Sequence, residues 1–179
     1  KGRILKVTAD EDGTIKETVV VADHMEHPNG IRIRGDYLYV TQSYLHPVKD
    51  PSGKLVSCVY RFRLDEHDVH ITNTLEDPNI LTTLITENPE CQYGADGIAF
   101  DSKGDLYVGN FGDGTVWKIT LNEDGTVKEK EIYARDPEEL VSTDGMVFDD
   151  EGNLYIADFC ANAIVKVDQN RTVKRLAQS

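Results

Sequence analysis

The order of hydrophobic and polar residues along the chain repeats every 48 residues. Residues 95–101 (Ala-Asp-Gly-Ile-Ala-Phe-Asp) return as residues 143–149 (Thr-Asp-Gly-Met-Val-Phe-Asp), an offset of 144 − 96 = 48. The same offset relates Leu-Tyr-Val at 106–108 to Leu-Tyr-Ile at 154–156. One offset that holds over separate segments indicates a repeat fold, and a unit of this length falls near the upper end of the range for propeller blades, about 40–50 residues.

Within one unit the pattern predicts four short strands. Residues 97–101 are small and apolar, as in a buried inner strand, and residues 106–108 follow after a turn. Residues 114–120 alternate between apolar and polar positions, and the turn before residues 126–133 contains Asp-Gly, in which glycine supplies the positive φ of a hairpin. Helical periodicity is absent apart from a turn or two at 137–141. The sequence therefore predicts an all-β propeller of four-stranded blades.

Earlier copies of the unit set the expected domain organisation. Residues 2–17 match residues 114–129 at an offset of 114 − 2 = 112, and the Pro-Asn-Gly-Ile segment at 28–31 matches the start of the later units. Asn29 and Asp96 are 96 − 29 = 67 residues apart, so this unit carries an insertion of about twenty residues beyond the 48-residue period. We expect one partial propeller domain, 1–179, with about three to three and a half blades: a blade end at 1–21, an inserted blade at 22–93, and blades at 94–133 and 134–179.

Strand direction places three polar residues on one face of this propeller. Antiparallel strands alternate their ends, so the starts of first strands lie beside the connections between second and third strands. That face collects Asn29, Asp96 and Asp144, each followed by glycine, and the insertions at about 44–54 and 76–93. Loops that elaborate one face of a repeat scaffold usually mark its binding side.

The three residues offer only oxygen ligands, which suit a hard cation such as Ca²⁺. First strands of a propeller surround its channel, so the side chains of Asn29, Asp96 and Asp144 are expected to meet at the channel mouth. Two neighbouring carboxylates without a cation would repel each other. The alternative is that Asn-Gly and Asp-Gly are simply favoured turn pairs.

Other polar and aromatic residues on the same face are candidates for substrate contact. Asn110-Phe111 and Asp158-Phe159 occupy equivalent positions 48 residues apart, and they either contact a substrate or pack the blades together. Gln42 and His46 belong to the long connection on this face. His24 and His27 are either a general base or ordinary loop residues, whereas His67 and His70 are expected to face solvent on an outer hairpin.

Charge and cysteine content narrow the class of protein. Lys and Arg total 19 against 32 Asp and Glu, a formal net charge of −13, which argues against binding to nucleic acid or to an anionic membrane. No apolar run approaches the roughly 18–20 residues of a membrane span. Cys58, Cys91 and Cys160 lie too far apart in sequence for a paired zinc motif or a disulfide framework, which favours a reducing compartment and the cytoplasm over secretion.

The starts of the units, with the Phe-Asp-x-x-Gly-x-Leu-Tyr segments that follow the later two, resemble the senescence-marker-protein/gluconolactonase/luciferin-regenerating-enzyme family. The resemblance implies a six-bladed propeller with one divalent cation at the channel mouth, commonly Ca²⁺, with Zn²⁺, Mn²⁺ and Mg²⁺ as alternatives. It implies that Asn29 and Asp144 are ligands, that Asp96 holds the matching position between them, and that Asp144 also acts as a base. The chain departs from the family in having about half the blades and no match for the expected Glu ligand. The resemblance thus implies a partial chain, which alone could be inactive.

These features predict a metal-dependent hydrolase that opens a lactone or a related ester of a small molecule, with Asp144 or Asp96 as the catalytic base. Two alternatives remain open at the level of sequence. One is a non-catalytic propeller that serves as a binding scaffold, as in NHL-type repeats, and that holds no ion. The other is a phosphotriesterase of the diisopropylfluorophosphatase type, which would use the same site.

Overall fold

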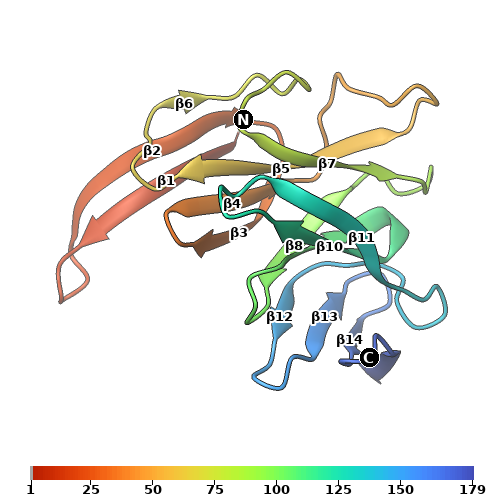
Figure 1. Ribbon diagram of the computed structural model, residues 1–179. Helices are drawn as coiled ribbons and strands as arrows, with labels where there is room; N and C mark the ends of the chain where they lie inside the picture. Colours follow the sequence, from red (N-terminus) through yellow and green to blue (C-terminus); the bar gives the residue numbers. More distant parts are fainter. Residues whose placement is uncertain (1) are drawn as a thin grey trace.

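The computed structural model describes residues 2–179, which form four β-sheets arranged one after another around a common axis (Figure 1). The first sheet contains β1 (Gly2–Ala9), β2 (Ile15–Met25) and the short β6 (Val69–His70). The second contains β3 (Pro28–Arg34), β4 (Tyr37–Gln42), β5 (Leu55–Arg63) and β7 (Ile80–Thr86).

The third and fourth sheets repeat the order of the second. They contain β8 (Ala95–Phe100), β9 (Leu106–Asn110), β10 (Thr115–Leu121) and β11 (Val127–Arg135), then β12 (Met146–Phe148), β13 (Leu154–Asp158), β14 (Ala163–Val167) and β15 (Val173–Gln178). Each is an antiparallel meander of four strands. In the part of the chain described, helical structure is limited to one 3₁₀ turn, Phe111–Asp113. The predicted all-β propeller of four-stranded blades is confirmed.

The insertion is organised differently from the expectation. Residues 80–86, expected as part of a loop elaboration, form β7, the outer strand of the second sheet. The chain between β5 and β7 leaves this sheet, and its strand β6 pairs in parallel with β2 of the first sheet. β2 itself continues to Met25, so the expected blade boundary at residues 21 and 22 falls within a strand.

Apolar side chains fill the joints between successive sheets. Three buried clusters lie between the first and second, second and third, and third and fourth sheets. One contact recurs: Tyr39 packs edge-on against Phe100 of the next sheet with ring centroids 5.0 Å apart, and Tyr107 packs in the same way against Phe148 at 4.7 Å. Trp117 packs against the second of these clusters, as expected from the sequence. Each sheet is therefore held mainly by its neighbours in the chain.

The first strands approach one another backbone to backbone, and glycine permits this. A Cβ placed on Gly30 would lie 2.6 Å from the carbonyl oxygen of Asp96, and one placed on Gly97 would clash with the carbonyl oxygen of Asp144. Gly145 ends the series, with nothing within 4 Å of the corresponding position. The glycine after each polar residue is thus required by the close approach of the next blade.

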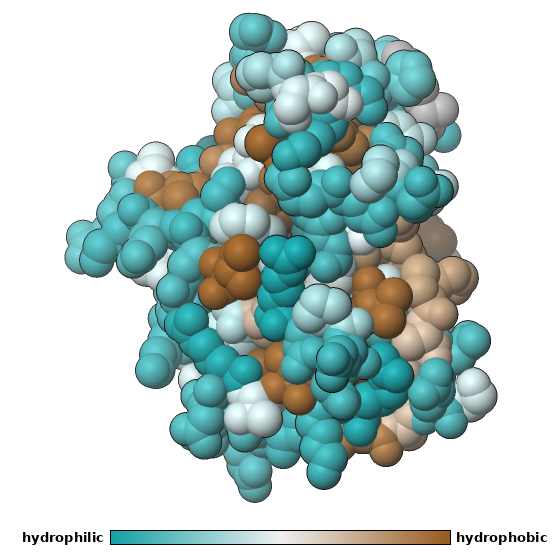
Figure 2. Space-filling view, turned by 90° about the vertical axis from the view of Figure 1, so that its right-hand side faces the viewer, coloured by the Kyte–Doolittle hydropathy of each residue, from teal (hydrophilic) through white to brown (hydrophobic). Residues whose placement is uncertain are grey.

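The outer surface is largely hydrophilic. Seen from the side, apolar side chains form separate patches among polar ones rather than one continuous area (Figure 2). Exposed apolar residues also lie on β3, where Ile33 is 63% exposed, and on β12, where Val147 is 59% exposed. Within residues 2–179 no helix has the length and apolar character needed to cross a membrane.

We expect Gly97→Ala to destabilise the fold, because the added methyl group meets the backbone of Asp144, which cannot move aside as a side chain would. Overpacking of this kind costs about 1–3 kcal/mol. Gly145→Ala is the matched control, since its methyl group points into open space. Urea denaturation of both variants measures the difference. Equal stabilities would show that the close approach of the strands does not constrain the fold.

Candidate functional site at the channel mouth

The three polar residues predicted to meet lie at the starts of three successive inner strands. Asn29 and Asp96 occupy the second positions of β3 and β8, and Asp144 precedes β12 by two residues. The Thr41 hydroxyl joins the first two: it donates to the carbonyl oxygen of Asp96 at 2.5 Å and accepts from the Gly30 amide at 2.7 Å. β8 contacts both β3 and β12, so Asp96 belongs to the middle strand of the group.

Asp96 is the most strongly perturbed acid of this face. It is only 5% exposed, and its Oδ1 is buried without a hydrogen-bond partner among the described residues. Burial, followed by repulsion from the carboxylate of Asp144, raises the pKa of Asp96 to about 7. Asp144 is half-buried and Asn29 is exposed. The carboxylates of Asp96 and Asp144 therefore lie close enough to interact, at a point that water reaches from Asp144.

An unpartnered buried carboxylate oxygen beside a second carboxylate is an arrangement that a cation would satisfy. Oxygen donors from two acids and one amide match the ligand preference of Ca²⁺. The residues present thus fit the divalent cation that the sequence led us to expect. Asn29, Asp96 and Asp144 are the residues that would hold it.

The residues that end the second strands of the blades are buried and bonded inside the protein. Asp158 accepts hydrogen bonds from the Ser142 amide and hydroxyl at 3.0 and 2.8 Å and from the Val141 amide at 2.7 Å. Asn110 donates to the carbonyl oxygen of Ile85 at 2.9 Å. Both bonds tie a second strand to the chain leaving the preceding blade. The geometry favours the packing role for Asn110 and Asp158 over substrate contact.

Gln42 holds the equivalent position in the second sheet. Its Oε1 accepts from the Glu26 amide at 3.0 Å, and its Nε2 donates to Asn73 at 2.8 Å. Gln42 is fully buried, so its amide group also serves the joint between blades. His46, in contrast, is exposed on the following connection, where it lines a cavity of about 240 Å³ with Tyr44, Lys49 and Gln92.

Phe111 and Phe159, predicted as walls of a pocket, belong to a longer row of rings on this face. Phe159 is 67% exposed and lies 6.1 Å from Phe111, measured between ring centroids, and Phe111 lies 6.1 Å from Tyr93. Tyr93 in turn lies 5.2 Å from His27. We call these four residues and Tyr44, which packs on His27 and Tyr93, the aromatic row.

Sequence reasoning missed two members of the aromatic row. Tyr44 and Tyr93 lie in the insertions, where there is no copy at 48 residues to compare with. The available signal was their place in loops on the face of Asn29. His27, considered as a base or a loop residue, is half-buried within the row, and its Nδ1 has no hydrogen-bond partner among the described residues.

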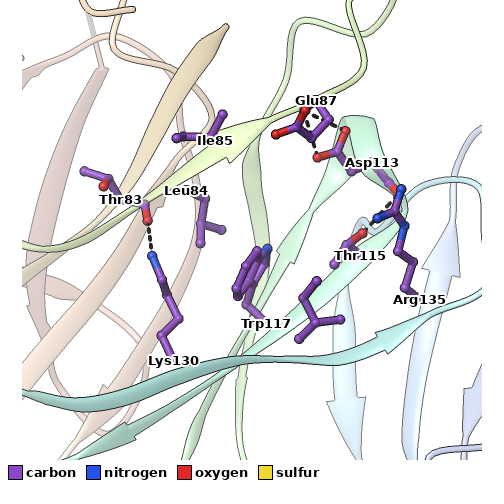
Figure 3. Close-up of a pocket in the computed structure, with 10 residues that line it drawn as sticks. Thr83, Leu84, Ile85, Glu87, Asp113, Thr115, Trp117, Lys130 and Arg135 are labelled. Carbon is purple, nitrogen blue, oxygen red and sulfur yellow. Dashed lines mark hydrogen bonds between the residues drawn. The ribbon is translucent and has the colours of Figure 1, made fainter. Parts of the chain in front are cut away.

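A separate cavity of about 370 Å³ lies away from the channel mouth, between β7 and the outer strands β10 and β11 (Figure 3). Lys130 crosses its floor, donating to the Thr83 carbonyl oxygen at 2.7 Å and lying over the Trp117 ring. Burial lowers the pKa of Lys130. The cavity contains none of the residues predicted as a site.

Comparison with known proteins finds similarity at the level of structure. No protein-family model matches the chain, and no curated protein matches it. Among solved structures, a luciferin-regenerating enzyme superposes with a TM-score of 0.62 at 15% identity over 99% of this chain and 55% of its own. A putative gluconolactonase gives 0.59 at 17% identity over 95% and 55%.

Two further matches show that this fold carries different activities. A gluconolactonase from Xanthomonas campestris gives a TM-score of 0.55 at 17% identity over 99% of this chain and 58% of its own. A PQQ-bound aldose sugar dehydrogenase from Streptomyces coelicolor gives the same score at 15% identity over 99% and 59%. The chain spans a little over half the length of these proteins. It thus has the fold of the gluconolactonase and luciferin-regenerating-enzyme propellers and matches about half of such a propeller.

Proposed function

We propose that the protein is a metal-dependent hydrolase of a lactone or related ester, with its reaction at the channel mouth. The observation that carries this proposal is the buried carboxylate of Asp96, whose Oδ1 lacks a partner and which faces the charge of Asp144. Such groups cluster at functional sites because burial and like charge are costly unless a ligand compensates for them. The similarity to gluconolactonase structures supports the choice of substrate class.

Asn29, Asp96 and Asp144 would hold one divalent cation, for which the oxygen donors favour Ca²⁺ over Zn²⁺, Mn²⁺ or Mg²⁺. A cation bound there supplies Lewis-acid polarisation of an ester carbonyl group. The carboxylates also set where the substrate lies: its carbonyl oxygen turns toward the ligand residues and its leaving group away from them.

Asp144 acts as the base in this proposal. It is half-buried, so a water molecule can reach its carboxylate, and it remains the charged member of the pair while Asp96 holds its proton more tightly. Asp144 would accept a proton from the attacking water, and that proton would pass to the departing alkoxide as the ring opens. Asp96, with a pKa of about 7, is the second candidate for this role.

The aromatic row would position the substrate. Phe159 and Tyr93 are largely exposed, at 67% and 42%, and rings held open to solvent on a binding face gain free energy when an apolar surface covers them. A lactone ring lying against Phe159 and Phe111 would be oriented by one flat face and shielded from bulk water on that side.

We expect the protein to hydrolyse a sugar lactone in the presence of Ca²⁺ and to lose this activity with EDTA. Asp144→Asn removes the base and should lower kcat by about 100-fold or more, with the fold retained in circular dichroism. Asp150→Asn, at an exposed acid in the turn after β12, is the control and should leave kcat unchanged. Hydrolysis that survives chelation would contradict the metal-dependent mechanism.

A second prediction concerns stability and pH. Because the pKa of Asp96 is higher in the folded state than in the unfolded chain, its proton stabilises the fold below about pH 4, and this contribution is lost as pH rises through about 7. Without a divalent cation, Asp96→Asn should therefore raise Tm at pH 8 and change it less at pH 5. The rise should be about 2–4 °C for each kcal/mol of repulsion removed.

Calcium provides the control for this experiment. Added Ca²⁺ should raise the Tm of the native sequence at pH 8, because the ion compensates both carboxylates, and it should act more weakly on Asp96→Asn. Thermal unfolding followed at pH 5 and pH 8 measures both effects. If Asp96→Asn lowers Tm at pH 8, Asp96 is not the strained group described above.

A third prediction tests the aromatic row. Phe159→Ala should raise KM roughly tenfold with a smaller effect on kcat, because the ring contributes to binding in the ground state and transition state alike. Leu176→Ala is a matched control: Leu176 is an exposed apolar residue on the outer strand β15, away from the channel mouth. Steady-state kinetics with a sugar lactone and with a more apolar lactone should show the larger loss for the apolar one. Equal KM values for both variants would exclude Phe159 from the binding surface.

A further inference from the structure

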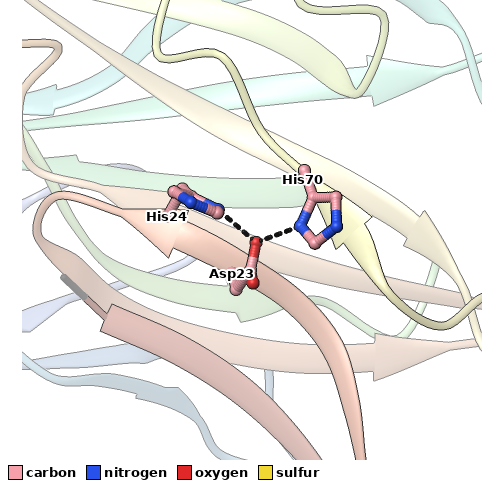
Figure 4. Close-up of side chains that lie close together, drawn as sticks. All are labelled: Asp23, His24 and His70. Atoms are coloured by element: carbon pink, nitrogen blue, oxygen red, sulfur yellow. Dashed lines mark hydrogen bonds and ion pairs between the residues drawn. The ribbon is translucent and has the colours of Figure 1, made fainter.

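A second group of ligand-type side chains lies on the outer edge of the first sheet, in a different place from the channel mouth. Asp23 and His24 are neighbours near the end of β2, and His70 ends β6 (Figure 4). One ligand atom from each lies within 4.8 Å of the others. In the part of the chain described, this is the only such group of three His, Cys, Asp or Glu side chains.

The backbone of β2 is distorted at this point in a way that brings two neighbours together. Successive side chains of a regular strand point to opposite faces, so Asp23 and His24 would normally diverge. His24 instead has φ of 63°, a left-handed conformation that is uncommon for a residue other than glycine. As a result its Nδ1 lies 2.5 Å from Oδ1 of Asp23. Uncommon backbone conformations of this kind cluster at functional sites.

The insertion between β5 and β7 brings in the third side chain, and it is firmly attached. β6 pairs in parallel with β2, which sets His70 opposite Asp23. The Asp68 amide donates to the Val20 carbonyl oxygen at 2.8 Å, and Asn73, which is buried, donates to the His24 carbonyl oxygen at 2.9 Å. These bonds flank His70 on both sides, so its position is set by the fold.

The three side chains point at one place. Nδ1 of His70 lies 2.6 Å from the same Oδ1 of Asp23 that His24 approaches, and the two imidazole rings are 5.4 Å apart and nearly perpendicular. Both imidazoles are more than half exposed, and the carboxylate of Asp23 is 22% exposed. The group is therefore open to an ion from solvent, and its two rings are free to adjust.

Two imidazole nitrogens and one carboxylate oxygen form a donor set for a borderline transition metal rather than for Ca²⁺. Bonds of about 2.0–2.1 Å around Zn²⁺ would place tetrahedral ligand atoms roughly 3.4 Å apart. The Nδ1–Oδ1 contacts of 2.5 and 2.6 Å would have to open by about an ångström, a movement within reach of exposed side chains. A fourth position would be left to water.

We propose that Asp23, His24 and His70 bind a divalent transition metal of the zinc class, which clips the insertion of residues 64–79 to the first sheet. The ion takes the place of the shared hydrogen bonds on Asp23 and joins two segments 47 residues apart in sequence. Its role is structural, because it fixes a strand pairing that otherwise consists of β6 alone. It requires neither Asp96 nor Asp144.

The chain contains a matched control for this site. His67 lies in the same insertion, is 65% exposed, and its Nδ1 lies 2.9 Å from the Asp68 carboxylate, but no second imidazole is listed with it in the described ligand group. We expect the metal-free protein to bind one equivalent of Zn²⁺ in calorimetry. The affinity should be unchanged in His67→Ala and in Asp96→Asn, and it should fall at least about tenfold in His24→Ala and His70→Ala.

Two further measurements distinguish an ion clip from simple hydrogen bonding. Co²⁺ added to the native protein should give the visible spectrum of a tetrahedral nitrogen and oxygen site, and His70→Ala should abolish it. Zn²⁺ should slow hydrogen exchange at the amides of Asp68 and Ile71, which donate to β2. Equal Zn²⁺ affinities in His67→Ala and His70→Ala, or exchange rates that Zn²⁺ leaves unchanged, would overturn the proposal.

Discussion

The close approach of the inner strands is the constraint on which the rest of this structure depends. Each blade contributes its first strand to the channel wall, and the wall closes only if one backbone lies directly against the next. Gly30 and Gly97 leave no room for a Cβ because the carbonyl oxygens of Asp96 and Asp144 lie there. Thr41 reinforces the first of these joints with hydrogen bonds to both sides. The polar side chains that precede the glycines are consequently drawn to one point.

This convergence has an electrostatic cost that explains the candidate site. Packing of β8 between β3 and β12 buries Asp96 and leaves its Oδ1 without a partner, while Asp144 remains nearby and half-exposed. A protein without a use for this arrangement could carry Asn or Ser at position 96 and avoid both burial of charge and repulsion. The fold therefore tolerates strain at the place where a cation and a substrate would meet, and ligands that bind only the folded state repay such strain.

The repeat made the blades predictable, and its interruptions did not. A 48-residue period located the sheets from β8 onward to within two residues, because each strand had a second copy to confirm it. The role of Asp158 was left open by the sequence, since an acid on a loop of the binding face serves equally well for packing or for chemistry. Only its three bonds to Val141 and Ser142 distinguish these roles. Tyr93 and β6 had no repeat partner, and β6 depends on a parallel pairing with a strand far away in sequence.

The insertion links the two groups of polar side chains through one buried amide. Asn73 receives a hydrogen bond from Gln42, which ends β4 at the channel mouth, and donates one to the carbonyl oxygen of His24 at the outer group. Gln42 also accepts from the Glu26 amide, so first sheet, second sheet and insertion meet at this residue. An ion that fixes His24 would thus fix the backbone to which Asn73 is bonded, and through it the joint between the first two blades. Because His27 and Pro28 follow this joint directly, the orientation of Asn29 depends on it. The left-handed conformation of His24 is therefore placed where a small change in backbone torsion would be felt at the channel mouth.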